Sequence, residues 1–101
     1  MERAYTVLTG KQRSFLRGLG NGAAVVLQVG KGNLSDAVLK QAEDALEARE
    51  LIKVRVLKAC SDTPAQIAEQ LAAGVHAEVV QVLGRNFLLY RKSAKELIEL
   101  P

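Results

Sequence analysis

Three helix-start signals separated by short apolar segments constrain the fold of this chain more than any other feature. Residues 9–12 (TGKQ) and 63–66 (TPAQ) are capping boxes, in which a Thr and a Gln side chain each bond the backbone N–H of the other residue. Ser35 suits a third helix N-terminus. Apolar residues recur at helical spacing after each signal. The pattern predicts three helices, from Thr9 to the glycine-rich residues 18–22, from 34 or 35 to about Arg49, and from Pro64 to near Gly74.

Four other segments have the composition of β-strands. Residues 23–29 (AAVVLQV) are mostly apolar, which is typical of a strand buried on both faces. Residues 50–58 alternate, with Ile, Val and Val on one face and with Lys and Arg on the other, which predicts a strand with one wet face. Residues 78–83 and 87–90 are predicted strands joined by a hairpin turn at 84–86.

The resulting order is α-β-α-β-α-β-β. Strands linked by helices are expected to be parallel neighbours, and the last two must be antiparallel. A chain of 101 residues can bury one core but not two. The sequence therefore predicts a single compact α/β domain with a four-stranded mixed sheet packed by helices. The last residues, 92–101, are expected to form a loose helical turn around Leu97 and Ile98.

Composition excludes several classes of protein. The single cysteine, Cys60, excludes an intramolecular disulfide. No apolar run approaches the ~20 residues that span a bilayer, and no signal segment is recognisable, so we expect a cytoplasmic protein without a membrane partner. The sequence shows no paired carboxylates, metal-ligand cluster or nucleophile with a base. We expect no catalytic residue, metal, cofactor or small-molecule substrate.

Positive charge is concentrated in the first third of the chain. The net charge is +3 and the pI is about 9.2. Residues 1–34 carry five basic residues and one acidic residue, and residues 51–59 add three more cations. Folding could collect these groups on one side of the domain, although blocks of charge can equally mix over the surface. The candidate cations for a polyanionic partner are Lys11, Arg13, Arg17, Lys31, Lys53, Arg55, Arg85 and Arg91.

The segment QVGKGNLSD, residues 28–36, places two glycines around a lysine just before a predicted helix. A nucleotide P-loop needs a glycine where Val25 stands and a Ser or Thr where Gly32 stands. A dinucleotide fingerprint needs a glycine at Ser35. Two interpretations remain open. One is a short turn whose N–H groups and helix N-terminus bind nucleic acid phosphates, as the GXXG loop of the KH module does; the other is an ordinary connection between a strand and a helix.

Four segments together carry a resemblance to a known family. They are LTGKQRSFLRGL (8–19), VVLQVGKGNLSDAVL (25–39), ALEARELIKVRV (45–56) and VQVLGRNFLLYR (80–91). The chain resembles the YhbY-like proteins, the stand-alone bacterial form of the CRM domain (chloroplast RNA splicing and ribosome maturation). The resemblance divides the chain into an N-terminal extension (1–7), a CRM-like RNA-binding domain (8–92) and a C-terminal tail (93–101).

The resemblance implies a fold related to the C-terminal domain of translation initiation factor three. It also implies binding to ribosomal RNA in precursors of the large ribosomal subunit. We expect the protein to be a monomer. The GxxG loop of the family maps onto Gly30, Lys31, Gly32 and Asn33, with the last glycine replaced by Asn33. Asn tolerates a left-handed backbone best among the other residues, so we expect the turn to be kept. The alternative is a protein-interaction module of the assembly machinery with only incidental RNA affinity.

Overall fold

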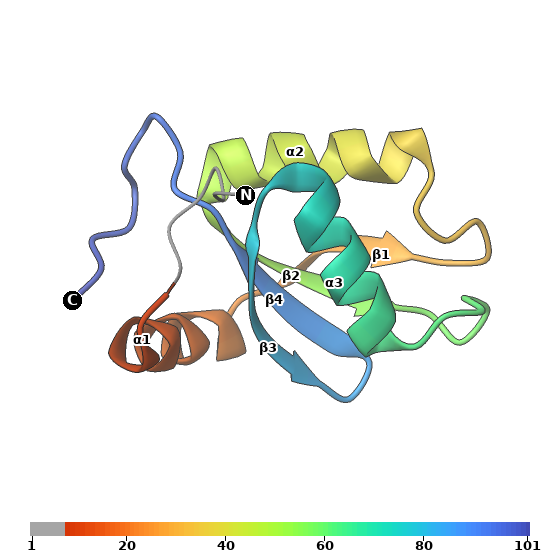
Figure 1. Ribbon diagram of the computed structural model, residues 1–101, viewed down its shortest axis with the longest axis horizontal. Coiled ribbons are helices and arrows are strands. Elements are labelled where there is room, and N and C mark those ends of the chain that lie inside the picture. The colour runs from red at the N-terminus through yellow and green to blue at the C-terminus, as the bar shows by residue number, and fades with distance from the viewer. Residues whose placement is uncertain (1–7) are drawn as a thin grey trace.

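A four-stranded mixed sheet with three helices packed on it forms the protein (Figure 1). The computed structural model describes residues 8–101, and the predicted extension of residues 1–7 lies outside this range. The strand order in the sheet is β1-β2-β4-β3. Along the chain the elements are α1 (Gly10–Asn21), β1 (Val25–Val29), α2 (Asp36–Arg49), β2 (Leu51–Val56), α3 (Pro64–Val75), β3 (Glu78–Leu83) and β4 (Asn86–Tyr90). The predicted α/β class, element order and mixed sheet are confirmed.

The local signals that predicted the helices operate as expected. The Thr side chain at the start of α1 and of α3 accepts from the N–H of the Gln three residues on, and each Gln side chain accepts in return. Ser35 caps α2 by accepting from the Val38 N–H. Each cap satisfies backbone N–H groups that the first turn of a helix leaves without an intrahelical partner.

The strand pairing differs from the expectation at one position. β1 pairs with β2 in parallel, as predicted for strands joined by a helix. β2 and β3 are also joined by a helix, but β4 lies between them and is antiparallel to both. The predicted parallel contact between β2 and β3 is therefore wrong, because the hairpin folds β4 back into the position beside β2.

Helices cover the two faces of the sheet unequally. α2 and α3 pack on one face and bury the main core, whose fully covered side chains include Val29, Leu46, Val54, Leu71 and Phe87. α1 packs on the other face near β3 and β4, over a smaller cluster formed by Leu8, Leu16, Val80, Leu88 and Tyr90. Part of this second face is left without a helix.

One prediction about the first elements is confirmed and one is wrong. The glycine-rich residues 18–22 were expected to end the first helix, and α1 ends there, at Asn21 with Gly22 as its C-cap. Gly20 lies inside the helix, where a Cβ would overlap the Leu88 side chain, so glycine permits the close approach of α1 to β4. β1 is not buried on both faces: it is an edge strand, and its Val25 and Gln28 are exposed.

The C-terminal tail is tied to the domain by one buried carboxylate. Glu50 accepts from the N–H and the Oγ–H of Ser93, at 2.8 and 2.9 Å, and from the Ile98 N–H at 2.7 Å. Burial raises the pKa of the Glu50 carboxyl, but these hydrogen bonds outweigh it and leave the pKa below its ordinary value. The predicted helical turn around Leu97 is wrong. The tail instead makes one turn at Ser93–Glu96 and lays Ile98 and Leu100 against the smaller cluster.

Within residues 8–101, no helix combines the length and apolar composition that crossing a bilayer requires.

Candidate functional site

Three connections meet at one end of the sheet, where β1 and β2 finish and the hairpin joins β3 to β4. We call this end of the sheet the loop edge. The connections are residues 30–33 after β1, residues 57–63 after β2, and the turn at Gly84 and Arg85 between β3 and β4. Backbone hydrogen bonds join them: the Leu57 N–H donates to the Val29 carbonyl at 2.8 Å, and the Val56 N–H donates to the Arg85 carbonyl at 2.7 Å. Figure 1 shows the first two connections extending beyond the sheet on the same side. The loop edge is thus a continuous surface made of segments far apart in the sequence.

The GKGN segment forms a tight turn at this edge. The Asn33 N–H donates to the Gly30 carbonyl at 2.9 Å, and Asn33 has a left-handed φ of 52°. The expectation that Asn keeps the turn is confirmed. Gly32 is exposed, its φ is not in the left-handed region, and a Cβ there would meet nothing within 4 Å. Neither the fold nor the backbone conformation therefore requires glycine at position 32.

The Asn33 side chain joins this turn to the loop after β2. Its Nδ2 donates to Ser61 Oγ at 3.0 Å and to Asp62 Oδ2 at 3.4 Å. Its Oδ1 accepts from Cys60 Sγ at 3.1 Å and from the Ser61 N–H at 3.4 Å. Glycine could make none of these bonds, so the asparagine at this position couples the two loops.

Arg85 joins the hairpin to the same loop. Its Nε donates to the Val56 carbonyl at 2.7 Å and its Nη2 to the Leu57 carbonyl at 2.9 Å. Both acceptors are uncharged, so the guanidinium orders the loop edge and still contributes its positive charge there.

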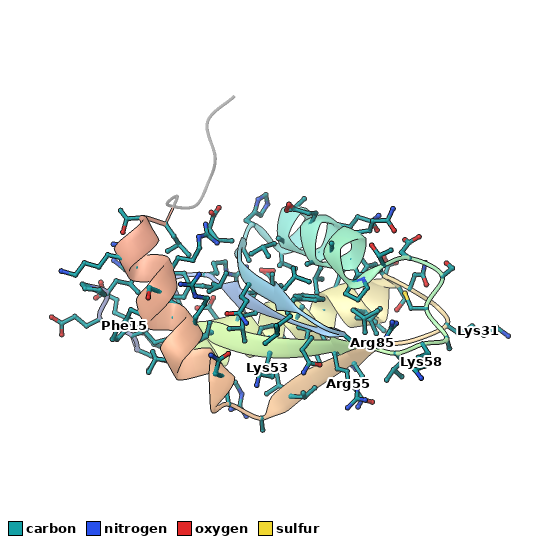
Figure 2. The ribbon with its side chains drawn as sticks, turned by 90° about the horizontal axis from the view of Figure 1, so that it is seen from below. Phe15, Lys31, Lys53, Arg55, Lys58 and Arg85 are labelled. Carbon is teal, nitrogen blue, oxygen red and sulfur yellow. The ribbon has the colours of Figure 1, made fainter. Side chains whose placement is uncertain are left out.

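Three further cations lie along this edge without internal ion pairs. Lys31 and Lys58 are exposed at the two loops, and Arg55 is exposed on β2. Among residues 8–101 none of the three makes a hydrogen bond through its side chain or an ion pair within 4 Å. Figure 2 shows Lys31 and Lys58 at one end of the molecule, with Arg85 and Arg55 next along the same side. Asp36 and Asp62 are the nearby carboxylates, so the edge keeps a net positive charge.

Two helices begin at the loop edge. α2 follows the GKGN turn and α3 follows residues 57–63. The N-terminus of a helix carries a partial positive charge, which favours an anion beside it. Asp36 lies in the first turn of α2, whereas the first turn of α3 has no acidic residue. The backbone therefore adds to the positive potential that the side chains create.

Other predicted site residues have different surroundings. Arg91 is only 15% exposed and pairs with Glu43 and Glu47, so its charge is neutralised within the protein. Arg13 donates to the Val79 and Val80 carbonyls and thereby fixes α1 to β3. The structure does not bring these two arginines to the loop edge.

The remaining predicted cations lie on the face of the sheet that carries α1. Lys53 donates from Nζ to the carbonyl of Asn21, the last residue of α1, at 3.3 Å. Lys11 and Arg17 are exposed on α1 itself, away from the loop edge. Lys58 was not among the predicted site residues, although it belongs to the basic block at 51–59 that the sequence shows.

The described part of the chain contains no group of three or more His, Cys, Asp or Glu side chains that could hold a metal ion. Cys60 is buried behind the loop edge as a free thiol. Apart from Asp36 and Asp62, the polar side chains at this edge are cations and neutral groups, which suit an anionic partner.

Comparison with known proteins gives consistent matches over almost the whole chain. The family model of the CRS1/YhbY (CRM) domain matches residues 8–91. The "Probable RNA-binding protein YqeI" of Bacillus subtilis is 45% identical, and the match covers 94% of this chain and all of that protein. A protein of Haemophilus influenzae named "RNA-binding protein" is 38% identical, with 95% and 97% of the two chains covered. The solution structure of the hypothetical protein SAV1595 from Staphylococcus aureus matches with a TM-score of 0.79 at 43% identity, covering 94% of this chain and all of that one.

Proposed function

The chain belongs to the CRS1/YhbY (CRM) domain family, and from this premise we propose that it is an RNA-binding protein whose loop edge contacts the RNA backbone. Relatives that match nearly full length are named as RNA-binding proteins, which supports RNA as the partner. We propose in addition that the RNA is ribosomal RNA in precursors of the large ribosomal subunit, and that the protein assists assembly without acting as an enzyme.

One observation carries this proposal: the lysines of two separate loops, Lys31 and Lys58, share one edge and have no ionic partner among the described residues. The bonds of Asn33 to the loop after β2 hold the two loops together, so their spacing is set before RNA arrives. Preorganised cations lose less conformational freedom when they bind. Structured RNA is recognised largely through its shape and phosphates, which such an edge can follow.

The glycines of the turn support the same function. Because a Cβ at Gly32 would meet no protein atom, the space above this residue is open to a ligand. An RNA phosphate could approach the exposed backbone N–H groups there and be neutralised by Lys31. We therefore place Gly30, Lys31, Gly32, Asn33, Arg55, Lys58 and Arg85 in the proposed interface, and leave Arg13 and Arg91 out because their guanidinium groups are bound inside the protein.

The test is a charge-removal experiment on the two loops. Lys31→Ala combined with Lys58→Ala should weaken binding of a fluorescently labelled RNA hairpin at least tenfold at moderate salt. Removing one phosphate contact should also reduce the slope of log affinity against log salt by about 0.7 to 0.9, depending on whether the contact lies on the loop or on the stem, so the slope of the double variant should fall by roughly 1.4 to 1.8. Lys95→Ala removes an exposed lysine from the tail and serves as the matched control. Unchanged affinity in the folded double variant would show that the loop edge is not the RNA site.

The finer proposal needs a separate measurement. Tagged protein should sediment with precursors of the large ribosomal subunit, and the double variant should be absent from these fractions. Sedimentation of both proteins free of ribosomal particles would contradict the ribosomal part of the proposal without affecting RNA binding itself.

A protein-interaction module is the second candidate, and one observation favours it. Phe15 and Leu19 lie one turn apart on α1 and are 41% and 46% exposed. Exposed apolar side chains of this size can mark a protein contact. A pull-down from lysate treated with nuclease separates the two functions: partners that persist after removal of RNA favour a protein interaction, and partners that disappear favour RNA binding.

A further inference from the structure

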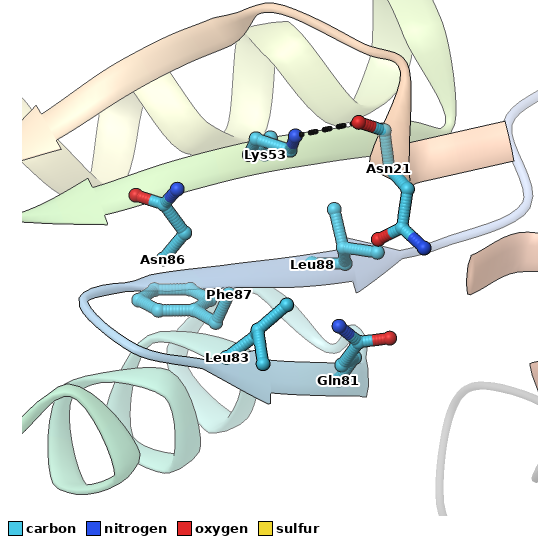
Figure 3. Close-up of a pocket in the computed structure, with 7 residues that line it drawn as sticks. All are labelled: Asn21, Lys53, Gln81, Leu83, Asn86, Phe87 and Leu88. Atoms are coloured by element: carbon cyan, nitrogen blue, oxygen red, sulfur yellow. Dashed lines mark hydrogen bonds between the residues drawn. The ribbon is translucent and has the colours of Figure 1, made fainter. Parts of the chain in front are cut away.

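A pocket opens on the face of the sheet that α1 covers only in part (Figure 3). It contains about 270 Å³ of unfilled space, some of it continuous with solvent. Only a small part of this space is enclosed, so it suits one planar ring lying against the sheet better than a larger molecule. Its side chains come from the end of α1 and from three strands: Asn21, Lys53, Gln81, Leu83, Asn86 and Leu88.

A residue that lines the pocket holds a hydrogen-bond acceptor without a donor. The Asn86 side-chain oxygen, Oδ1, is buried and has no partner in the described part of the protein. Buried polar atoms are nearly always satisfied, and an exception requires an explanation such as a bound group. Asn86 begins β4 directly after the hairpin turn, so its position is fixed by the sheet on both sides.

The chemistry around Asn86 matches the surface of a nucleobase. Asn21, Gln81 and Asn86 each offer an amide that can donate and accept, and Leu83 and Leu88 offer apolar surface. A nucleobase has apolar faces and an edge of alternating donors and acceptors, which proteins bind when the base is unpaired. Asn86 Oδ1 itself is covered, so the amide of Asn86 would have to turn toward the pocket before a base N–H or exocyclic amine could supply the donor that this oxygen lacks (Figure 3).

The pocket is also continuous with the proposed phosphate site. Asn86 is the cross-strand partner of Arg55, which is exposed between the pocket and the loop edge. Lys53 lines the pocket itself and carries a further positive charge. Figure 2 shows Lys53, Arg55, Lys58 and Lys31 in succession along one side of the protein. An RNA strand that follows these cations to the loop edge would pass the pocket.

We propose that this pocket takes one unpaired base of the RNA that the loop edge holds. This inference rests on the proposed RNA-binding function and adds a base contact to its phosphate contacts. A peptide amide could use the same hydrogen-bonding groups. The continuous row of cations favours RNA, whose phosphates these cations would neutralise.

The experiment compares wild-type protein with Asn86→Leu and with Lys31→Ala. The probes are short single-stranded oligonucleotides of A, C or U and a fully paired RNA duplex, each with a fluorescent label. Asn86→Leu should lower the affinity for at least one of the single strands about tenfold, as expected for removal of one bound base, and leave duplex affinity unchanged. Lys31→Ala should weaken both kinds of RNA binding. Because leucine removes the unpartnered oxygen, the variant should be at least as stable as wild type in urea unfolding.

The outcomes distinguish this inference from the function on which it rests. If wild type binds RNA and Asn86→Leu binds every probe with the same affinity as wild type, the pocket is not a base site. The proposed RNA site at the loop edge is unaffected by this result. Absence of any RNA binding by wild type overturns both.

A second readout uses the wild-type protein labelled with ¹⁵N. The side-chain amide signals of Asn86 should shift when the single strand is added and stay in place with the duplex. Signals that stay in place with both RNAs while the Lys31 amide shifts would also overturn the pocket. Binding of a peptide but of no single strand would show that the occupant is a protein segment.

Discussion

The two ends of the sheet use the same local device for different purposes. At the loop edge, Asn33 has a left-handed φ of 52° and its side chain holds the loop after β2. At the opposite end, which we call the tail edge, Glu50 has a left-handed φ of 67° and its side chain holds residues 93–98. In both cases a residue other than glycine adopts an unfavourable conformation because its side chain fixes a distant segment.

The two edges differ in what happens to charge. At the tail edge the Glu50 carboxylate is fully buried and accepts hydrogen bonds from the tail, and Arg91 forms ion pairs with Glu43 and Glu47. At the loop edge the tie is a neutral amide, and Lys31 and Lys58 remain exposed. A charge that is used to stabilise the fold is thus no longer available to bind a partner. This difference separates arginines and lysines that look alike in the sequence.

The largest effect on stability is expected at the tail edge. Glu50→Gln replaces a charged acceptor of several hydrogen bonds by a neutral one, and hydrogen bonds to charged groups contribute about 1.5–3 kcal/mol each. We expect the free energy of unfolding, measured by urea denaturation at neutral pH, to fall by about 3 kcal/mol. RNA affinity should stay within twofold of wild type. If the folded Glu50→Gln variant lost RNA affinity, the tail edge would also take part in RNA binding, and the two edges would not have separate roles.

The difference in the free energy of unfolding between wild type and Glu50→Gln should depend on pH. The folded protein lowers the pKa of Glu50 below its ordinary value of 4.5. The stabilisation from its charge is therefore fully present above pH 4.5 and is lost as the pH falls through the lowered pKa. The difference in the free energy of unfolding between wild type and Glu50→Gln should be constant above pH 4.5 and should become smaller below it.

A smaller effect on stability is expected at Asn33. Asn33→Gly relieves the left-handed backbone, but it removes the bonds to Cys60, Ser61 and Asp62. We expect a net loss of about 1 kcal/mol in urea unfolding, since several neutral hydrogen bonds outweigh the relief. The loop after β2 should also loosen, so the Cys60 thiol should react faster with a thiol reagent. Equal reaction rates and equal stability would show that Asn33 does not couple the loops.

The smallest effect on stability is expected at Gly32. Because a Cβ there meets nothing and φ is unstrained, Gly32→Ala should leave the protein unchanged or more stable by up to about 1 kcal/mol. RNA affinity should nevertheless fall roughly tenfold, as for removal of one charge-assisted hydrogen bond to a phosphate. Gly18→Ala on α1 is the matched control, because a Cβ there also meets nothing. Unchanged affinity for Gly32→Ala would place the RNA away from the turn.

Sequence patterns could predict what depends on neighbours in the chain. The capping boxes specified where α1 and α3 begin, and alternation specified the wet and the buried face of β2. The position of β4 between β2 and β3 depends on pairing over long separations, which no local pattern contains. The same limit applies to Gly20, because its close approach to the Leu88 side chain joins residues that are far apart in the sequence.

The candidate site shows this limit more sharply. The GKGN turn and its lysine could be found because the motif is local. Arg91 could not be told from Lys31 by sequence, since its carboxylate partners lie 44 and 48 residues away. Lys58 and Asn86 could not be recognised as site residues from the sequence, because only the fold places Lys58 beside the GKGN turn and Asn86 at the pocket.

The RNA site can be mapped directly by titrating the ¹⁵N-labelled protein with an RNA hairpin that has a single-stranded loop. If RNA binds at the loop edge, backbone amide signals should shift at residues 30–33 and 57–61, and those at residues 47–50 and 91–98 should stay in place. Shifts concentrated at the tail edge, or around Phe15 and Leu19 on α1, would contradict RNA binding at the loop edge.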